Sequence, residues 1–375
     1  MPADLSTISI PADLLPADGR FGCGPSKVRP EAVAHLAEVA GDLLGTSHRQ
    51  PAVRDQVKRV RDGLRQLFSL PADYEIAVGN GGATLFWDAA VFSLIQRRSA
   101  HAVFGEFSSK FAASARLATF LEDPVVVESP AGSHPTLEVV DGVDLYALTH
   151  NETSTGVAMP IRRPGPDAFV AVDATSGAGA LPVDAAEFDA YYFSPQKAFA
   201  SEGGLWWALL SPAAVERIQS LTAGDRYVPP ILDLSIALEN SRAEQTYNTP
   251  SVSTVFLMAE QVDWLLEHGG LDWSVAQCRA KAEHLYRWAE QREWATPYVA
   301  DPAMRSSVVC TIDIDDRVAA DDITAVLRRH GVLDIDAYRK LGRNQLRVGV
   351  FPAVDRGDVE RLTESIDHVV DALSG

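Results

Sequence analysis

The chain of 375 residues has few cysteines. Its three cysteines, Cys23, Cys278 and Cys310, lie far apart and form no CxxC pair. This spacing provides no disulfide framework and suits a reducing compartment, with three buried or idle thiols. We predict no structural disulfide and no metal site.

Positive charge and long apolar runs are also scarce. Lysine and arginine total 33 against 51 acidic residues, so the net charge is −18. Nucleic acids and anionic membranes require basic surfaces, and we expect neither as a partner. No apolar run reaches the roughly 18 residues that a membrane helix needs. The first twenty residues carry acids and prolines where a signal peptide would carry lysines and an apolar block, so we expect a cytoplasmic protein.

Short apolar segments alternate with helical patterns over the first 250 residues, and no internal repeat is found. Such alternation predicts an α/β fold with a mainly parallel sheet covered by helices on both faces. The segments expected as strands are 74–78, 101–104, 143–150, 168–173 and 191–194, and those expected as helices are 30–44, 51–70, 84–96 and 108–121.

The pattern changes near residue 251. Two long amphipathic helices, over 251–268 and 271–292, precede a tail in which strand and helix patterns alternate. We predict a large domain over residues 22–265. A smaller α+β domain would follow over 266–375, together with an irregular N-terminal arm, 1–21.

Two residues after apolar strands indicate chemistry. Asp173 ends the strand AFVAVD, and a buried carboxylate there would need a cationic partner, although it could also cap a helix. Lys197 follows the aromatic segment YYFS, where burial would lower its pKa and make it a nucleophile. Taken alone, Lys197 could equally be a surface lysine on a loop.

Two further turns lie at strand ends, where ligands collect in parallel sheets. The stretch VGNGGATLFWD (78–88) has glycines before a helix and offers backbone N–H groups to a phosphate, or it is a plain tight turn. Thr153, in HNETSTG, could bond a ligand or stabilise the turn. A carboxylate for a ring nitrogen, a lysine 24 residues later and a phosphate turn together predict a pyridoxal phosphate site.

Six motifs in order make the resemblance specific. The stretches RFGCGPSKV, GTSHR, NETSTG, VDATS, SPQK and YNTP resemble the phosphoserine aminotransferase family, most closely its actinobacterial members, over nearly the whole chain. The resemblance implies a fold-type I pyridoxal phosphate aminotransferase with a large domain and a smaller C-terminal domain. It also implies a homodimer with shared active sites.

Carried over residue by residue, the resemblance assigns Lys197 as the Schiff-base lysine and proton carrier, and Asp173 as the partner of the ring nitrogen. Asn248 and Thr249 would reach the cofactor of the other subunit; otherwise their loop is a routine turn. The residues expected to bind the cofactor are Gly82, Ala83, Thr84, Phe107, Thr153, Asp173, Gln196, Lys197, Asn248 and Thr249.

Substrate binding is expected from arginines, whose planar forks suit carboxylate and phosphate. By the same resemblance, Arg347 would bind the α-carboxylate. His48, Arg49 and Arg339 would hold the distal phosphate, or the γ-carboxylate of glutamate. Alternatively, Arg347 forms a surface salt bridge and His48 with Arg49 caps a loop.

Two positions depart from the family pattern. Phe107 stands where many members stack a tryptophan on the cofactor, or it is simply a core residue. Tyr338 precedes Arg339 where the family has a His-Arg pair, in a slightly longer segment that leaves the register of Arg343 open.

The resemblance predicts amino transfer from L-glutamate to 3-phosphohydroxypyruvate, giving O-phospho-L-serine and 2-oxoglutarate. A four-carbon phosphorylated keto acid from pyridoxal phosphate biosynthesis is a possible second substrate. The alternatives are a serine–pyruvate or alanine–glyoxylate transaminase, a cysteine desulfurase, or a non-catalytic module that binds the cofactor. The desulfurase is disfavoured because no cysteine lies on a suitable loop. The non-catalytic module is disfavoured because Arg49 and Arg347 accompany Lys197.

Overall fold

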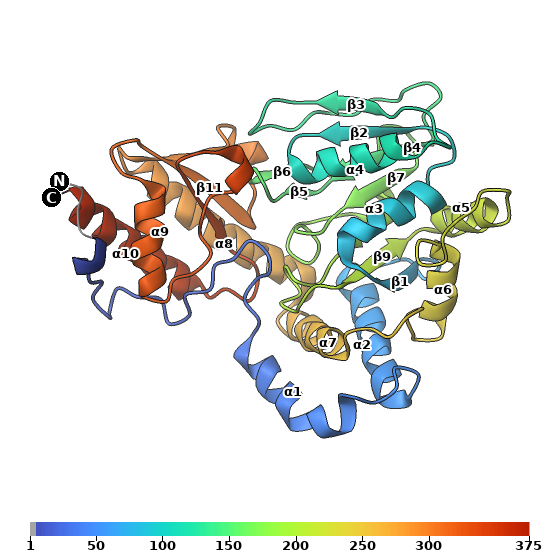
Figure 1. Cartoon of the computed structure of the whole chain (residues 1–375), viewed down its shortest axis with the longest axis horizontal. Helices are drawn as coiled ribbons and strands as arrows, with labels where there is room; N and C mark the ends of the chain where they lie inside the picture. The colour runs from blue at the N-terminus through green and yellow to red at the C-terminus, as the bar shows by residue number, and fades with distance from the viewer. Residues whose placement is uncertain (1–4, 375) are drawn as a thin grey trace.

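A computed structural model describes residues 5–374, and its main feature is a seven-stranded sheet (Figure 1). The strand order is β1-β9-β8-β7-β4-β2-β3. Only β9 runs antiparallel to its neighbours; the other paired strands are parallel. In sheet order the strands are Glu75–Asn80, Leu205–Leu210, Ala190–Phe193, Val170–Asp173, Leu145–Thr149, Ser99–Val103 and Val125–Glu128. This confirms the predicted mainly parallel α/β sheet.

Helices cover both faces of this sheet, because successive side chains of each strand point to opposite sides. Tyr191 and Phe193 of β8 pack on the side of α2 (Pro51–Leu67) and α7 (Val252–Glu267). Tyr192, between them, packs on the opposite side. The helices on that side are α3 (Gly82–Ser93), α4 (Glu106–Leu117), α5 (Pro212–Thr222) and α6 (Leu234–Arg242).

The C-terminal part forms a second sheet with its own core. Its three antiparallel strands are β10 (Ala295–Pro297), β11 (Val309–Ile314) and β12 (Gln345–Gly349). The helices α8 (Gly270–Glu290), α9 (Ala320–Arg329) and α10 (Arg356–Ser374) pack against it, and the N-terminal arm lies on α10 through Ser365 and His368. The predicted domain boundary at 265/266 lies in the last turn of α7, and the division itself stays a prediction.

The expected helices and strands are present within a few residues of their predicted ends. The elements that were not predicted from the sequence include β3, β9, α5 and α6. One of them, β9, has the sequence LWWALL and is entirely buried. The remaining elements are α1 (Pro30–Leu43), the short strands β5 (Asn151–Glu152) and β6 (Val157–Ala158), and four 3-10 turns, Leu5–Thr7, Ala185–Glu187, Pro302–Met304 and Arg339–Leu341.

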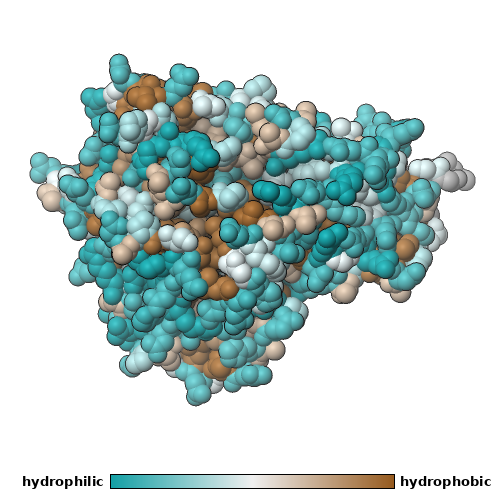
Figure 2. Space-filling view, turned by 180° about the vertical axis from the view of Figure 1, so that it is seen from behind, coloured by the Kyte–Doolittle hydropathy of each residue, from teal (hydrophilic) through white to brown (hydrophobic). Residues whose placement is uncertain are grey.

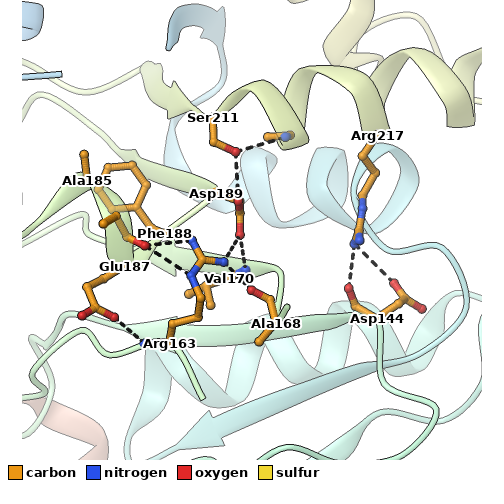
Figure 3. Close-up of polar contacts among 12 residues, drawn as sticks. Asp144, Arg163, Ala168, Val170, Ala185, Glu187, Phe188, Asp189, Ser211 and Arg217 are labelled. Atoms are coloured by element: carbon orange, nitrogen blue, oxygen red, sulfur yellow. Dashed lines mark hydrogen bonds and ion pairs between the residues drawn. The ribbon is translucent and has the colours of Figure 1, made fainter. Parts of the chain in front are cut away.

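The amino ends of the central strands are held by structural ion pairs (Figure 3). Asp189, just before β8, accepts hydrogen bonds from Arg163 Nη1 at 2.6 Å, Val170 N at 2.8 Å and Ser211 Oγ at 2.9 Å. Beside it, Arg217 donates to the carbonyl of Asp144 at 2.7 Å. This edge is therefore filled by its own partners, whereas the opposite, carboxyl edge faces a cavity.

Candidate active site

A cavity of about 370 Å³ lies at the carboxyl ends of β4, β7 and β8, next to the start of α3. The predicted residues that line it are Gly82, Ala83, Thr84, Phe107, Thr153, Asp173, Gln196 and Lys197. A larger groove of about 950 Å³ between His150 and α8 is lined by none of the predicted site residues. The chemistry expected from the sequence therefore converges on the smaller cavity.

Asp173 is buried at the end of β7 and is held by three donors. Thr175 donates its N–H and hydroxyl to Oδ1 at 3.0 and 2.6 Å, and Trp87 Nε1 donates to Oδ2 at 2.8 Å. Burial raises the pKa of the Asp173 carboxyl, while these bonds and the charge of Lys197 oppose the rise. A cation placed in the cavity would relieve the cost of this buried charge.

Lys197 follows β8 and is buried, not on the surface. Its Nζ donates to the carbonyl of Cys23 at 2.5 Å, and burial lowers its pKa to about 8. Gly24 approaches so closely that a Cβ there would overlap Lys197 Nζ. The amine is thus directed by the segment Cys23–Gly24 and is neutral in part near neutral pH, as a nucleophile requires.

The glycine turn opens α3 on another side of the cavity. Gly81, the N-cap, has φ of 109°, a conformation that favours glycine. The N–H groups of Gly82, Ala83 and Thr84 belong to the first helical turn and have no acceptor four residues back. Together with the positive helix end they form a site for an anion such as phosphate.

Phe107 and Thr153 complete the lining. Phe107, at the start of α4, is partly buried and presents an aromatic ring. Thr153 Oγ1 donates to Ser176 Oγ at 2.8 Å, and its carbonyl accepts from Arg347 Nη1 at 3.2 Å. The Thr153 loop thus connects the cavity to β12, which carries Arg347.

Arg347 lies beside the cavity, and its Nε is buried with no hydrogen-bond partner among residues 5–374. Its guanidinium lies 5.2 Å from the centre of the Tyr338 ring, and that ring lies 6.2 Å from the ring of Phe107. A buried donor without a partner is costly, which suits a group that binds an anion.

Several predicted residues do not line the cavity of this single chain. His48 and Arg49 lie between α1 and α2, and the Nε2 of His48 is buried without a partner in the described part of the chain. Asn248 and Thr249 are exposed beside Asn80, which bonds to both. Arg339 is exposed. Arg343, whose register was open, pairs with Asp313.

The residues at the site that were not predicted from the sequence include Trp87, Gly24, Thr175 and Ser26. Ser26 donates its hydroxyl to the carbonyl of Lys197 at 2.5 Å. The entry motif RFGCGPSKV contains Gly24 and Ser26, so the family resemblance pointed to them without giving a role. Nothing local marks Trp87, because its partner Asp173 lies 86 residues away.

The cavity fits pyridoxal phosphate. Asp173 can pair with a protonated ring nitrogen. Lys197 can react with an aldehyde carbon, and the first turn of α3 can bind a phosphate. Among residues 5–374 no cluster of acidic, histidine or cysteine side chains could hold a metal ion. Within the same range no helix has the length and hydrophobicity to cross a bilayer.

Comparisons with known proteins identify the family of this chain. The model of the Aminotransferase class-V family matches residues 22–335. The phosphoserine aminotransferase of Rhodococcus opacus (strain B4) is 56% identical over 370 residues, 98% of this chain and 99% of that protein. A protein of Mycobacterium avium (strain 104) is 59% identical over 368 residues, 98% of each chain.

Solved structures show the same fold. A phosphoserine aminotransferase from Cytophaga hutchinsonii superposes with a TM-score of 0.87 at 25% identity, covering 93% of this chain and 99% of that one. The enzyme from Bacillus circulans subsp. alkalophilus gives 0.82 at 20% identity, covering 94% and 98%. The chain therefore belongs to the phosphoserine aminotransferase family within the class-V aminotransferases.

Proposed function

We propose that this protein transfers the amino group of L-glutamate to 3-phosphohydroxypyruvate and forms O-phospho-L-serine and 2-oxoglutarate. Pyridoxal phosphate is the proposed cofactor, and the four-carbon phosphorylated keto acid of its biosynthesis is a second candidate substrate. The observation that carries the proposal is the buried pair Lys197 and Asp173, which lines one cavity with the first turn of α3.

Lys197 has the properties of the residue that binds the cofactor and moves the proton. Its pKa of about 8 leaves part of the amine neutral near neutral pH, so that it can attack a carbonyl carbon and accept a proton. When bound, pyridoxal phosphate supplies an electron sink for the substrate Cα. Asp173, fixed by Thr175 and Trp87, would hold its carboxylate toward the ring nitrogen of the cofactor and would favour the protonated form of that nitrogen.

Arg347 is the proposed ligand of the substrate α-carboxylate. Its Nη1 is tethered to the carbonyl of Thr153, while the unpartnered Nε leaves a donor available for a carboxylate oxygen. The Tyr338 ring against its guanidinium restricts where that donor can point. The arginine is thereby oriented before the substrate arrives.

The distal phosphate requires positive groups, and neither His48 nor Arg49 lines the cavity of its own chain. We propose a homodimer in which His48, Arg49, Asn248 and Thr249 serve the cavity of the second copy, while Arg339 acts from the small domain of the same chain. This arrangement accounts for the exposure of Arg49, Asn248 and Thr249 in the single chain. Phosphate and γ-carboxylate would then share one cluster of cations.

The test is to follow the absorbance of the purified protein with pyridoxal phosphate. L-glutamate should bleach the visible band, and 3-phosphohydroxypyruvate should restore it with formation of O-phospho-L-serine. Lys197→Ala should abolish the cycle. A visible band that glutamate leaves unchanged would overturn the transaminase assignment, and a protein that takes up no cofactor would overturn the site.

A further inference from the structure

Glu152 is the most completely buried carboxylate beside the cavity. It ends β5, its side chain has no exposed surface, and it does not line the cavity itself. Its Oε2 accepts from Ser108 N at 3.0 Å, Ser108 Oγ at 2.9 Å and Phe107 N at 3.2 Å, and its Oε1 accepts from Ser154 Oγ at 2.7 Å. The two backbone N–H groups can only donate, so the carboxyl accepts from both. Burial raises the pKa of Glu152, and its bonds to Ser108, Ser154 and Phe107 oppose the rise.

These contacts satisfy the N–H groups of the first turn of α4, whose N-cap residue is a glycine and offers no capping side chain. Its N-cap is Gly105, whose N–H donates to Ser108 Oγ at 3.1 Å, and the N–H of Glu106 donates to Ser154 Oγ at 3.1 Å. Both hydroxyls lie within hydrogen-bond distance of Glu152, and the Ser108 hydroxyl also lies 3.2 Å from the carbonyl oxygen of Gly105. A Cβ at Gly105 would overlap the Glu152 side chain. Glu152 therefore caps α4 from another element, at the helix end that favours negative charge.

Two residues next to this cap line the cavity. Phe107, whose N–H it binds, lines the cavity as one of its aromatic residues, and Thr153, the next residue in the chain after Glu152, also lines it. We propose that Glu152 is a positioning residue: its carboxylate fixes the first turn of α4 so that the Phe107 ring lies flat against the ring of the cofactor. The proposal rests on the proposed function, because it requires that the cavity holds that ring.

The test measures affinity for pyridoxal phosphate by titration of visible absorbance, together with visible circular dichroism of the bound cofactor. Glu152→Gln keeps the shape but places an amide N–H where only acceptors fit. We expect about three- to tenfold weaker cofactor binding, the range of an aromatic contact, and a changed dichroic band. Ser154→Ala, which removes one relay and keeps the carboxylate, should show a smaller effect in the same direction. It provides the test if Glu152→Gln does not fold.

Asp189→Asn is the matched control. Asp189 is another buried carboxylate that accepts a backbone N–H, from Val170, but it lies at the opposite edge of the sheet (Figure 3). Its variant should melt at a lower temperature and bind the cofactor as the wild type does. A merely structural role for Glu152 would make the two variants behave alike.

A double-mutant cycle tests the route through Phe107. In a Phe107→Leu background, Glu152→Gln should change cofactor affinity by less than about twofold, because the ring it positions is gone. An unchanged affinity of Glu152→Gln, or the same loss with and without Phe107, would overturn the inference while leaving the proposed function intact. A wild-type protein that binds no pyridoxal phosphate would instead overturn the proposed function, and this inference with it.

Discussion

At the scale of single residues, the cavity is built at a cost to folding, because it buries groups that prefer to be charged in water. Lys197 has a folded-state pKa of about 8 against its ordinary 10.5. Below pH 8 the Lys197 amine is protonated in both the unfolded and the folded chain. Because the charge is desolvated only in the folded chain, it destabilises the folded state. The difference in pKa corresponds to about 3 kcal/mol, at about 1.4 kcal/mol for each unit.

Lys197→Met should therefore stabilise the cofactor-free protein. At pH 7 we expect the free energy of unfolding of the variant to exceed that of the wild type by about 2–3 kcal/mol. Its advantage should shrink as the pH rises from 8 to 10.5, because the wild-type amine then loses its proton. Chemical denaturation of both proteins across this pH range measures the difference between their free energies of unfolding. The contributions of the other titrating groups are the same in both proteins and cancel in this difference. A constant difference would show that the Lys197 charge is not the cause.

The hydrogen bond from Trp87 to Asp173 can be isolated with a matched tryptophan. Trp87→Phe removes the N–H that reaches Oδ2 at 2.8 Å and should cost about 1–2 kcal/mol beyond the lost packing. Trp207 is also buried, but its Nε1 has no partner among residues 5–374, so Trp207→Phe loses packing alone. Urea denaturation of both variants gives the difference, and equal losses would contradict a stabilising bond at Asp173.

The sequence allowed some of these residues to be predicted and not others. Asp173 and Lys197 could be predicted because each follows an apolar strand, and strand ends are local features of the chain. Glu152 and Trp87 could not, because their partners lie 44 to 45 and 86 residues away and meet only in the folded chain. Glu152 belongs to the motif NETSTG, but the motif does not indicate that this residue caps α4, which only the fold shows.

At the scale of elements, the segment between α9 and β12 links the two sheets. It carries Tyr338, which lies between Phe107 of α4 and Arg347 of β12, and Lys340, which pairs with Glu106 at the start of α4. The Lys340 pair joins partly exposed groups and contributes little by itself. The Tyr338 ring is the part of this segment that bears on the proposed substrate site, because it lies against the guanidinium of Arg347.

Replacing Tyr338 separates two roles for this segment. Tyr338→Ala should raise KM for both substrates about three- to tenfold, because a cation–π contact of this size orients Arg347. Tyr338→Phe keeps the ring and should leave both KM values near those of the wild type. Steady-state kinetics with glutamate and with 3-phosphohydroxypyruvate measure this. If Tyr338→Phe raised KM for the phosphorylated substrate alone, the hydroxyl would be a phosphate ligand instead.

The elements themselves were predictable where a pattern was strong. The valines and leucines of α2 recur on one face and end buried against the sheet, as their spacing predicts. β9 was missed because LWWALL is apolar throughout and gives no alternation. Its antiparallel direction is likewise set by the partners β1 and β8, which the local sequence does not contain.

At the scale of the whole molecule, the surface bears on the proposed homodimer. Seen from behind, the surface is mostly hydrophilic, with its hydrophobic areas confined to patches (Figure 2). Exposed large apolar residues include Val33, Leu44 and Tyr247. Val33 lies in α1, Leu44 directly follows that helix, and Tyr247 precedes Asn248. These segments adjoin the residues proposed above to serve the other subunit, so the proposed homodimer would cover their apolar side chains.

A hybrid dimer tests whether the sites are shared. Lys197→Ala and Arg49→Ala homodimers should each be nearly inactive, for loss of the amine and of a phosphate ligand respectively. If Arg49 acts on the cavity of the other subunit, a purified hybrid of the two chains contains one site with both Lys197 and Arg49. Such a hybrid should recover about half of the wild-type kcat per dimer, because a two-fold dimer has two equivalent sites. If Arg49 served its own chain, each site of the hybrid would lack one group, and the hybrid would remain as inactive as its parents.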